Sequence, residues 1–256
     1  MWLVVLLLPV GLHAQWAAWP TGGAPKLART ANGQFDMDAP APKAADGHPD
    51  LSGVWDRGMP SEKSQRPFQD LPSMFSGGLP LQPWAAKVRA ERKEQNSRDH
   101  PDAHCLPLHP LQLHSHPQPR KIIQTRNEVV ILYEANDGRR EIFLDGRKLP
   151  ADPEPWWYGY SVGKWDGDTL VVESTGFRDM SWIDEEGTPM MSSGRLTERF
   201  RRINTGTLDI DATVDDPKTF TKPWTIHLTQ KLMPDTELIE FVCAENNRSL
   251  PHLIGK

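Results

Sequence analysis

Apolar and polar residues alternate in a series of short runs between residues 121 and 243, and this period of two predicts half-buried β-strands. The run 207–214 is the clearest, because every second residue from Leu208 to Val214 is apolar and the residues between them are polar. The first predicted strand is 51–55, and the later ones are 121–125, 128–135, 139–145, 158–165, 168–175, 195–202, 207–214, 224–232 and 237–243.

Turn-forming sequences separate these runs, including Asn136-Asp137-Gly138 and Asp166-Gly167. Asn, Asp and Gly tolerate the positive φ angles that tight hairpins require, and short connections make neighbouring strands antiparallel. The sequence therefore predicts a mainly β fold. We expect a single antiparallel meander that closes into a lipocalin-like barrel or forms a strongly bent sheet, because closure removes exposed edges.

One helix is predicted outside this sheet, over residues 83–97. Pro83 stands at a favoured first-turn position, and strong helix formers follow it. Trp84, Ala85 and Val88 give the helix one narrow apolar stripe, so we expect it to pack peripherally on the domain.

The N-terminal part of the chain differs in composition from the rest. Residues 1–14 form an apolar run that is too short for a membrane span and is typical of a secretory signal peptide. Residues 15–49 are rich in Ala, Pro and Gly and predict a flexible lead-in. Residues 50–256 are expected to form a single β-barrel-like domain, periplasmic or secreted, with no membrane span after signal cleavage.

The charge of −5, with acidic and basic residues interleaved, argues against nucleic acid or an anionic membrane as a partner. The chain has no phosphate loop, dinucleotide glycine fingerprint, nucleophile elbow or paired zinc-ligand motif. These observations predict no cofactor, and they leave open the oligomeric state and whether the protein is an enzyme.

Cys105 and Cys243 are the only cysteines. An oxidising compartment favours a disulfide between them, and closing so long a loop contributes on the order of 4 to 5 kcal/mol through the entropy of the unfolded chain. Two free buried thiols are the alternative.

Several motifs occur in a fixed order along the chain. They are PDLSGVW (49–55), CLPL (105–108), IFLDGRKLP (142–150), GYSVGKWDGDTLVVESTGF (159–177), RLTERFRR (195–202), DDPKTFTKPW (215–224) and ELIEFVCAEN (237–246). Together they resemble a family of uncharacterised secreted proteins that is abundant in acidobacteria and some proteobacteria. The resemblance implies export but no established activity. Met191-Ser192 stands where the family typically carries a His-Ser pair, and Gly53-Val54-Trp55 is similar to the Gly-x-Trp element on the first strand of lipocalins.

Glu198 is the first candidate for chemistry, because it shares an apolar strand face with Leu196 and Phe200. A buried carboxyl group can act as a general acid or base, or can hold a polar ligand group. The alternative is a structural ion pair with an arginine such as Arg147 or Arg202.

Aromatic residues are concentrated in the strand region, and an aromatic wall with a few polar groups suits a small-molecule pocket. The predicted ligand-binding residues are Arg147, Tyr160, Trp165, Trp182 and Trp224. The alternative is that most of these rings fill the core.

Two clusters of residues raise the question of a metal. His114 and His116 would face one side of an extended strand, close in sequence to His104, Cys105 and His109, but the spacing matches no standard site. The prolines around them indicate an irregular, exposed loop. Acidic residues at positions 209, 211, 215 and 216 are expected on a solvated strand face and turn, so no metal site is predicted.

Two functions follow from these features. The first is a secreted or periplasmic protein that binds a small apolar or aromatic molecule or a carbohydrate in an aromatic-lined pocket. The alternative is a small periplasmic lyase, isomerase or hydrolase that acts on a glycan or polyphenol-type substrate, with Glu198 as general acid or base.

Overall fold

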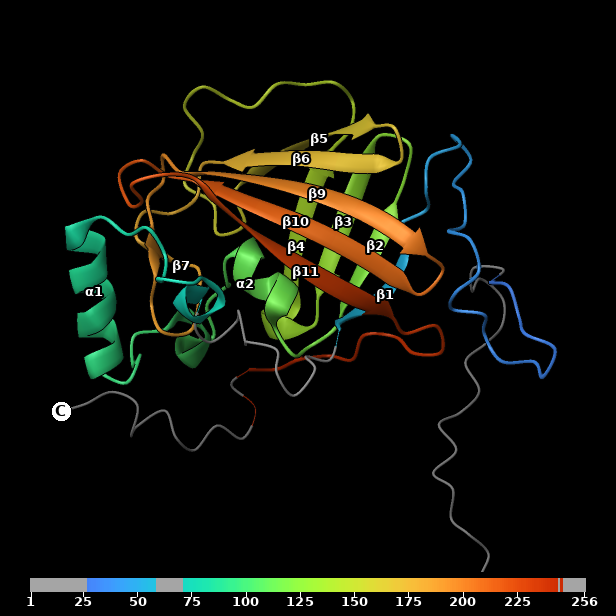
Figure 1. Cartoon of the computed structure of the whole chain (residues 1–256), viewed down its shortest axis with the longest axis horizontal. Coiled ribbons are helices and arrows are strands. Elements are labelled where there is room, and N and C mark those ends of the chain that lie inside the picture. The colour runs from blue at the N-terminus through green and yellow to red at the C-terminus, as the bar shows by residue number, and fades with distance from the viewer. Residues whose placement is uncertain (1–26, 59–70, 244, 246–256) are drawn as a thin grey trace, which may run out of the picture.

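Figure 1 shows the computed structural model of the chain, which describes residues 27–58, 71–243 and 245. The expected signal peptide at residues 1–14 lies outside the described residues. So does the first part of the lead-in.

Nine strands form a closed barrel with the order β1-β11-β10-β9-β6-β5-β4-β3-β2. Their bounds are β1 Gly53–Arg57, β2 Arg120–Gln124, β3 Glu128–Tyr133, β4 Gly138–Phe143, β5 Tyr160–Asp166, β6 Thr169–Thr175, β9 Arg195–Asn204, β10 Thr207–Asp215 and β11 Trp224–Leu232. A separate two-stranded sheet joins β7 (Ser181–Trp182) to β8 (Pro189–Met190). The prediction of a mainly β fold is confirmed, and of the two expected forms, a barrel or a strongly bent sheet, the structure has the closed barrel.

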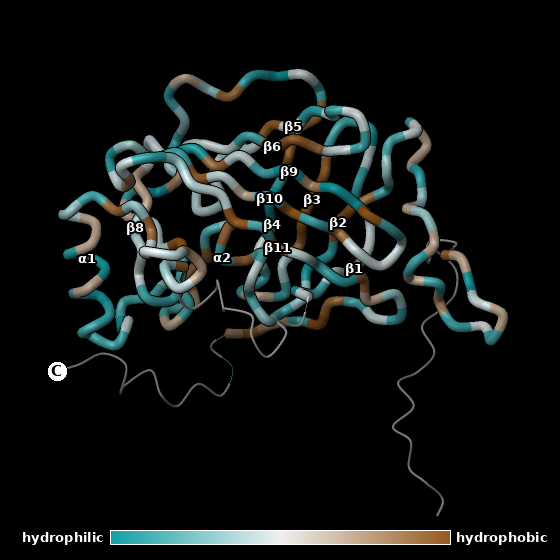
Figure 2. The backbone as a smooth tube through the Cα atoms, viewed as in Figure 1, coloured by the Kyte–Doolittle hydropathy of each residue, from teal (hydrophilic) through white to brown (hydrophobic). Residues whose placement is uncertain are grey.

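Buried and partly exposed residues alternate along the strands, as the sequence predicts. In β10, every second residue from Leu208 to Val214 is buried, and the residues between them are partly exposed. Figure 2 shows that hydrophobic positions recur along the strands of the barrel. The apolar face of each strand therefore points into one continuous core.

The topology departs from a simple meander at one place. β4 and β5 pair in parallel, with Ile142 opposite Ser161 and Phe143 opposite Val162. Parallel neighbours need a connection that returns to the starting end, so residues 144–159 form a long arch, visible over β5 in Figure 1. The prediction that all neighbours are antiparallel is wrong here. Residues 237–243 were also expected to be a strand, but they continue past β11 without pairing.

The peripheral helix is α1, Pro83–Glu94, which ends three residues earlier than predicted because Asn96 and Ser97 adopt positive φ. Ala85 is its buried residue, whereas Trp84 is partly exposed. Short 3-10 helices occur at Leu71–Met74, Pro101–His104 and Ala135–Asp137.

A second helix, α2 (Pro110–Ser115), corrects the prediction of an exposed loop in the His- and Pro-rich segment. All of its residues are buried. Pro110 occupies the first turn, and the His109 side chain caps the N-terminus by accepting a hydrogen bond from the Leu111 amide. The expectation of one helix therefore missed the element that lies against the interior of the barrel (Figure 1).

One end of the barrel is organised by Trp55, which is completely buried on β1. Its indole nitrogen donates to the Leu51 carbonyl at 2.9 Å, and the Arg202 guanidinium lies over its ring at 4.9 Å. Arg202 also donates to the carbonyl oxygens of Asp50 and Thr205. The guanidinium therefore joins the entry to β1 with the β9–β10 turn.

Residues 27–49 contact the same turn. The Thr205 amide donates to the Ala39 carbonyl and the Gly206 amide to the Met37 carbonyl, both at 2.8 Å. These bonds connect the described part of the lead-in to the barrel.

Cys105 and Cys243 form a disulfide with their Cα atoms 5.6 Å apart, which confirms the predicted pairing. It attaches the segment after β11 to the turn before α2. Within the described ranges, no helix has the length and apolar character that a membrane crossing requires.

Candidate functional site

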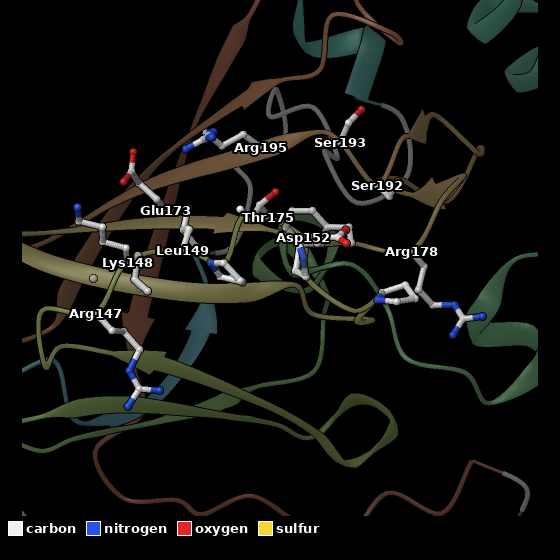
Figure 3. Close-up of a pocket in the computed structure, with 18 of the residues that line it drawn as sticks. Arg147, Lys148, Leu149, Asp152, Glu173, Thr175, Arg178, Ser192, Ser193 and Arg195 are labelled. Carbon is white, nitrogen blue, oxygen red and sulfur yellow. The ribbon is translucent and has the colours of Figure 1, made fainter.

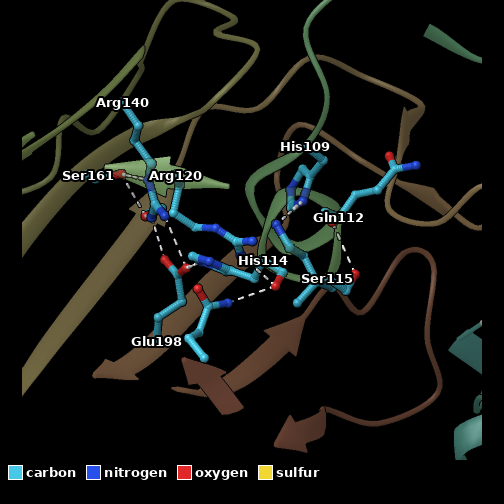
Figure 4. A network of polar contacts seen from close by, with 11 residues as sticks. His109, Gln112, His114, Ser115, Arg120, Arg140, Ser161 and Glu198 are labelled. Atoms are coloured by element: carbon cyan, nitrogen blue, oxygen red, sulfur yellow. Dashed lines mark hydrogen bonds and ion pairs between the residues drawn. The ribbon is translucent and has the colours of Figure 1, made fainter. Parts of the chain in front are cut away.

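The centre of the barrel contains a cluster of buried polar side chains, which we call the buried polar cluster. It consists of His114, Arg120, Tyr133, Arg140 and Glu198, contributed by α2, β2, β3, β4 and β9. Figure 4 shows the side chains of Arg140, Glu198 and His114 pointing toward one another. The four strand residues of the cluster occupy inward positions, so their burial follows from the alternation along the strands. His114 lies on the inward side of α2.

Glu198 is fully buried between Leu196 and Phe200. Arg140 donates to both carboxylate oxygens, with 3.0 Å between Nη1 and Oε1, and His114 Nε2 lies 2.5 Å from Oε1. The predicted partners Arg147 and Arg202 are wrong. Arg140 takes this role because β4 and β9, which are distant in sequence, both direct these residues into the same layer of the interior.

Arg140 is held from a second side. Its Nε donates to the Ser161 hydroxyl at 3.1 Å and its Nη2 to the Ser174 hydroxyl at 2.9 Å, from β5 and β6. Ser161 and Ser174 are themselves cross-strand partners. The guanidinium is therefore fixed by charged and neutral acceptors on three strands, which is the condition under which a buried charge is tolerated.

These contacts determine the charge of Glu198. Burial alone would raise its pKa, but the Arg140 charge and the hydrogen bonds from His114 and Arg140 together lower the pKa to about 2. Glu198 is therefore a carboxylate at any physiological pH and has no proton to donate as a general acid.

The histidines of this region are neutral. Burial is the main cause that lowers the pKa of His114, and it lowers the pKa of His109 to about 3. Because Nε2 of His114 faces a carboxylate, it carries the ring proton, and Nδ1 is an acceptor with no partner among the described residues. In His109, Nδ1 accepts from the Leu111 amide, so Nε2 carries the proton and likewise has no described partner.

The C-terminal end of α2 is fastened by polar groups from the barrel wall. The His114 carbonyl accepts from Arg120 Nη1 and from Gln230 Nε2, both at 2.8 Å. These bonds satisfy a carbonyl that the short helix leaves without an internal partner. The Tyr133 hydroxyl has no hydrogen-bond partner of good geometry among the described residues, and burial raises its pKa although the Arg140 charge opposes the rise.

Replacing Glu198 with Gln tests whether the cluster is structural. The variant keeps the side-chain volume but leaves the Arg140 guanidinium buried without a counter-ion, so we expect the free energy of unfolding to fall by about 3 kcal/mol in urea denaturation. Asp166→Asn is the matched control, because it removes an exposed ion pair with Arg199 and should cost less than about 1 kcal/mol. A Glu198→Gln protein that retains its stability but loses a ligand would instead identify Glu198 as a ligand contact.

The second candidate site lies on the outside of the barrel, and we call it the loop pocket. It lies between residues 146–155 of the arch and the outer faces of β5 and β6, and its cavity volume is about 1220 Å³. Figure 3 shows side chains of the arch, of β6 and of the segment before β9 around it. The parallel pairing of β4 and β5 creates this pocket, because the returning chain must cross the face of the sheet.

The far end of the arch is fixed to the segment after β6. The Trp156 amide donates to the Gly176 carbonyl at 2.8 Å, and the Arg178 amide donates to the Trp156 carbonyl at 3.1 Å. Gly176 adopts a positive φ, and a Cβ atom there would lie 2.6 Å from Pro153. Glycine therefore allows the arch to approach the sheet closely and to form one wall of the pocket.

The wall of the loop pocket is polar and charged. Lys148, Lys164 and Arg195 approach it from the arch, β5 and β9, and Asp152 and Glu173 approach it from the arch and β6. None of these five side chains forms a hydrogen bond or ion pair with another described residue. In Figure 3, Lys148, Glu173 and Arg195 gather at one end of the pocket.

The predicted ligand-binding residues do not converge on one site. Arg147 lines the loop pocket; it is held by Asp145 at 2.9 Å, donates to the Tyr160 hydroxyl at 3.2 Å and lies over the Phe143 ring. The three tryptophans lie elsewhere and contact other side chains: Trp165 stacks on His48, Trp182 contacts His100 and Arg92, and Trp224 contacts Phe75 and Phe220.

Across the described ranges, no three His, Cys, Asp or Glu side chains are grouped in a way that could hold a metal ion. His104 contacts the Arg98 carbonyl, and His114 lies in α2 rather than in an extended strand. On the outer face of β10, Asp211 accepts from His227 and Asp209 from Thr229.

The sequence predicted Glu198 as a candidate but did not indicate Arg140 or His114 as its partners. Of the predicted ligand-binding residues, Arg147 lines the loop pocket. One signal in the sequence points to Arg140: it stands two residues before Ile142 in a predicted strand, which puts both side chains on one face. Comparisons with protein-family models, with curated proteins and with solved structures each returned no match. The resemblance to secreted bacterial proteins therefore stays a prediction.

Proposed function

We propose that this protein binds a small molecule and that the ligand occupies the loop pocket. The observation that carries the proposal is a cavity of about 1220 Å³ that is lined by charged side chains, several of which, such as Lys148, Arg195 and Glu173, have no partner within the described part of the chain. Ligand sites are typically concave, largely pre-formed and lined by a few polar groups that orient the ligand. Arg147, fixed by Asp145 and Tyr160, is an example of such a pre-positioned group.

The proposed site is more polar than the aromatic-lined pocket that we expected from the sequence. Phe177 is the aromatic residue among its described lining residues, and Gly, Pro and aliphatic side chains provide the rest of its apolar wall. A ligand with polar groups therefore fits this site better than a purely apolar one.

An enzyme that uses Glu198 as general acid or base receives less support. The carboxylate is completely buried, its pKa is lowered to about 2, and its oxygens are taken by Arg140 and His114. Glu198 is also absent from the residues that line the loop pocket. Its best-supported role is to balance the Arg140 charge and hold α2 in position.

Export to the periplasm or the medium is part of the same proposal. The disulfide between Cys105 and Cys243 supports it, because such bonds persist in oxidising compartments. The apolar run at residues 1–14 agrees with this location.

Filling the loop pocket tests the binding function. Thr175 is a half-buried residue of β6 that lines the pocket, so Thr175→Trp should block it. We expect native mass spectrometry of the protein from its own host to detect a co-purified small molecule, and we expect the molecule to be absent from this variant.

Thr213→Trp is the matched control. Thr213 is a half-buried threonine on β10, outside the loop pocket, and this variant should retain the molecule. Retention of the same molecule by Thr175→Trp would overturn the proposal.

A further inference from the structure

We propose that the ligand of the loop pocket is an acidic carbohydrate, a sugar or short oligosaccharide that carries carboxylate groups. This inference rests on the proposed binding function and specifies its ligand class. It follows from the kinds of side chain that line the pocket and from the lack of described partners for five of the charged ones.

The cations supply the site for the acidic group. Lys148, Lys164 and Arg195 come from three separate elements and line one cavity. All three are exposed, and none forms an ion pair with a described residue. An arginine binds a carboxylate by donating two parallel hydrogen bonds to it, and neighbouring lysines add positive charge.

The carboxylates of the pocket indicate hydroxyl groups on the ligand. Asp152 and Glu173 line the same cavity, and neither is neutralised by a described cation. They would repel a compact polyanion such as inorganic phosphate. A carboxylate is, however, a strong acceptor for hydroxyl donors, and Thr175 and Ser193 add neutral hydroxyl groups. A ligand with an acidic group and several hydroxyl groups fits both sets of side chains: its acidic group pairs with the cations, and its hydroxyl groups donate to the carboxylates.

Flat apolar surfaces complete the fit. Pro150, Pro153 and Pro155 line the arch side of the pocket. Sugar rings present apolar C–H faces as well as hydroxyl groups, so one ring can pack on the prolines and form hydrogen bonds with the polar wall.

The volume agrees with more than one sugar unit. About 1220 Å³ exceeds the range of roughly 300 to 1,000 Å³ that is typical of pockets for drug-sized ligands. We therefore expect an acidic oligosaccharide to bind more tightly than the corresponding monosaccharide.

The test is calorimetric titration with three probes: trigalacturonate, the neutral galactotriose and citrate. We expect binding of trigalacturonate that weakens as salt is raised, and at least tenfold weaker binding of the other two. Citrate has three carboxylates but no sugar ring, so tight binding of citrate would show that negative charge is sufficient for binding. A sulfated disaccharide as a fourth probe separates carboxylate from sulfate recognition.

Matched variants locate the binding. Arg195→Gln should weaken trigalacturonate binding about tenfold, because it removes one charge-assisted pair. Arg201→Gln removes an outward arginine of the same strand that does not line the pocket, and it should bind like the wild type.

Three outcomes overturn the acidic-carbohydrate inference. The first is that galactotriose binds as tightly as trigalacturonate. The second is that citrate or the sulfated probe binds as tightly as trigalacturonate or more tightly. The third is that trigalacturonate does not bind. If a neutral molecule co-purifies and is lost in Thr175→Trp, the small-molecule proposal stands and only the ligand class is wrong. If no ligand depends on Thr175, both are wrong.

Discussion

Lowering the pH from 7.5 to 5 is expected to reduce the free energy of unfolding by about 6 kcal/mol, through three buried histidines at about 2 kcal/mol each. Burial is the main cause that lowers the pKa of His100 and His116 to about 4 and that of His109 to about 3. An unfolded chain titrates its histidines near pH 6.5. Between these values the unfolded state binds protons that the folded state does not bind.

The sign of this effect follows from the direction of the shifts. A histidine whose folded pKa is depressed is neutral in both states above about pH 6.5, so it costs no stability there. Below that pH the unfolded state gains protons, and stability falls until the folded pKa is reached. Asp184 acts in the opposite direction, because burial raises its pKa and protonation relieves the cost of its buried charge.

Urea denaturation at several pH values between 7.5 and 5 measures this dependence. A variant with His100, His109 and His116 all replaced by Asn should be less stable at neutral pH and should lose the part of the slope that these three residues contribute. His114, whose pKa burial also lowers, keeps its own contribution in the same direction. Stability that stays constant down to pH 5 in the original protein would contradict the assignment of neutral histidines to the interior.

The strands were predictable because alternation has a strict period of two wherever one face is buried. The set from Leu208 to Val214 in β10 and the inward position of Glu198 in β9 both follow from local sequence. The number of strands and the cost of exposed edges favoured a closed barrel or a strongly bent sheet, and did not decide between the two.

The pairing of strands that are distant in sequence was not predictable in the same way. Arg140 meets Glu198 only because β4 lies beside β5, β5 beside β6 and β6 beside β9. The connection from β4 to β5 is long enough to return the chain and allow parallel pairing. The loop pocket depends on this single crossover, so missing the crossover also meant missing the pocket.

The helix α2 was missed for a different reason. Six residues are too few for a helical period to be recognised, and the surrounding prolines are typical of loops. The burial of its one histidine, His114, depends on Arg120, Gln230 and Glu198, which come from three other elements. Composition therefore indicated exposure, whereas the polar groups of the barrel interior made burial possible.

Replacing both Cys105 and Cys243 with Ser is expected to lower the free energy of unfolding by about 4 to 5 kcal/mol. The bond joins residues 138 positions apart, so it restricts a large part of the unfolded chain. In the folded state it fastens the segment after β11, whose other contacts with the barrel include the ion pair between Lys121 and Glu237 and the bond from the Met233 amide to the Val54 carbonyl. The barrel itself closes through pairing of β1 with β2 and β11 and does not depend on the disulfide.

Urea denaturation of the variant and of the oxidised protein, each with and without a thiol reductant, separates the contributions. Because the effect acts mainly on the unfolded chain, the variant should keep the far-ultraviolet circular dichroism of a folded barrel while its unfolding midpoint falls. The reductant should destabilise the original protein and leave the variant unchanged. A loss below about 1 kcal/mol would mean that the unfolded chain stays compact without the bond, since the entropic gain requires an expanded reference state.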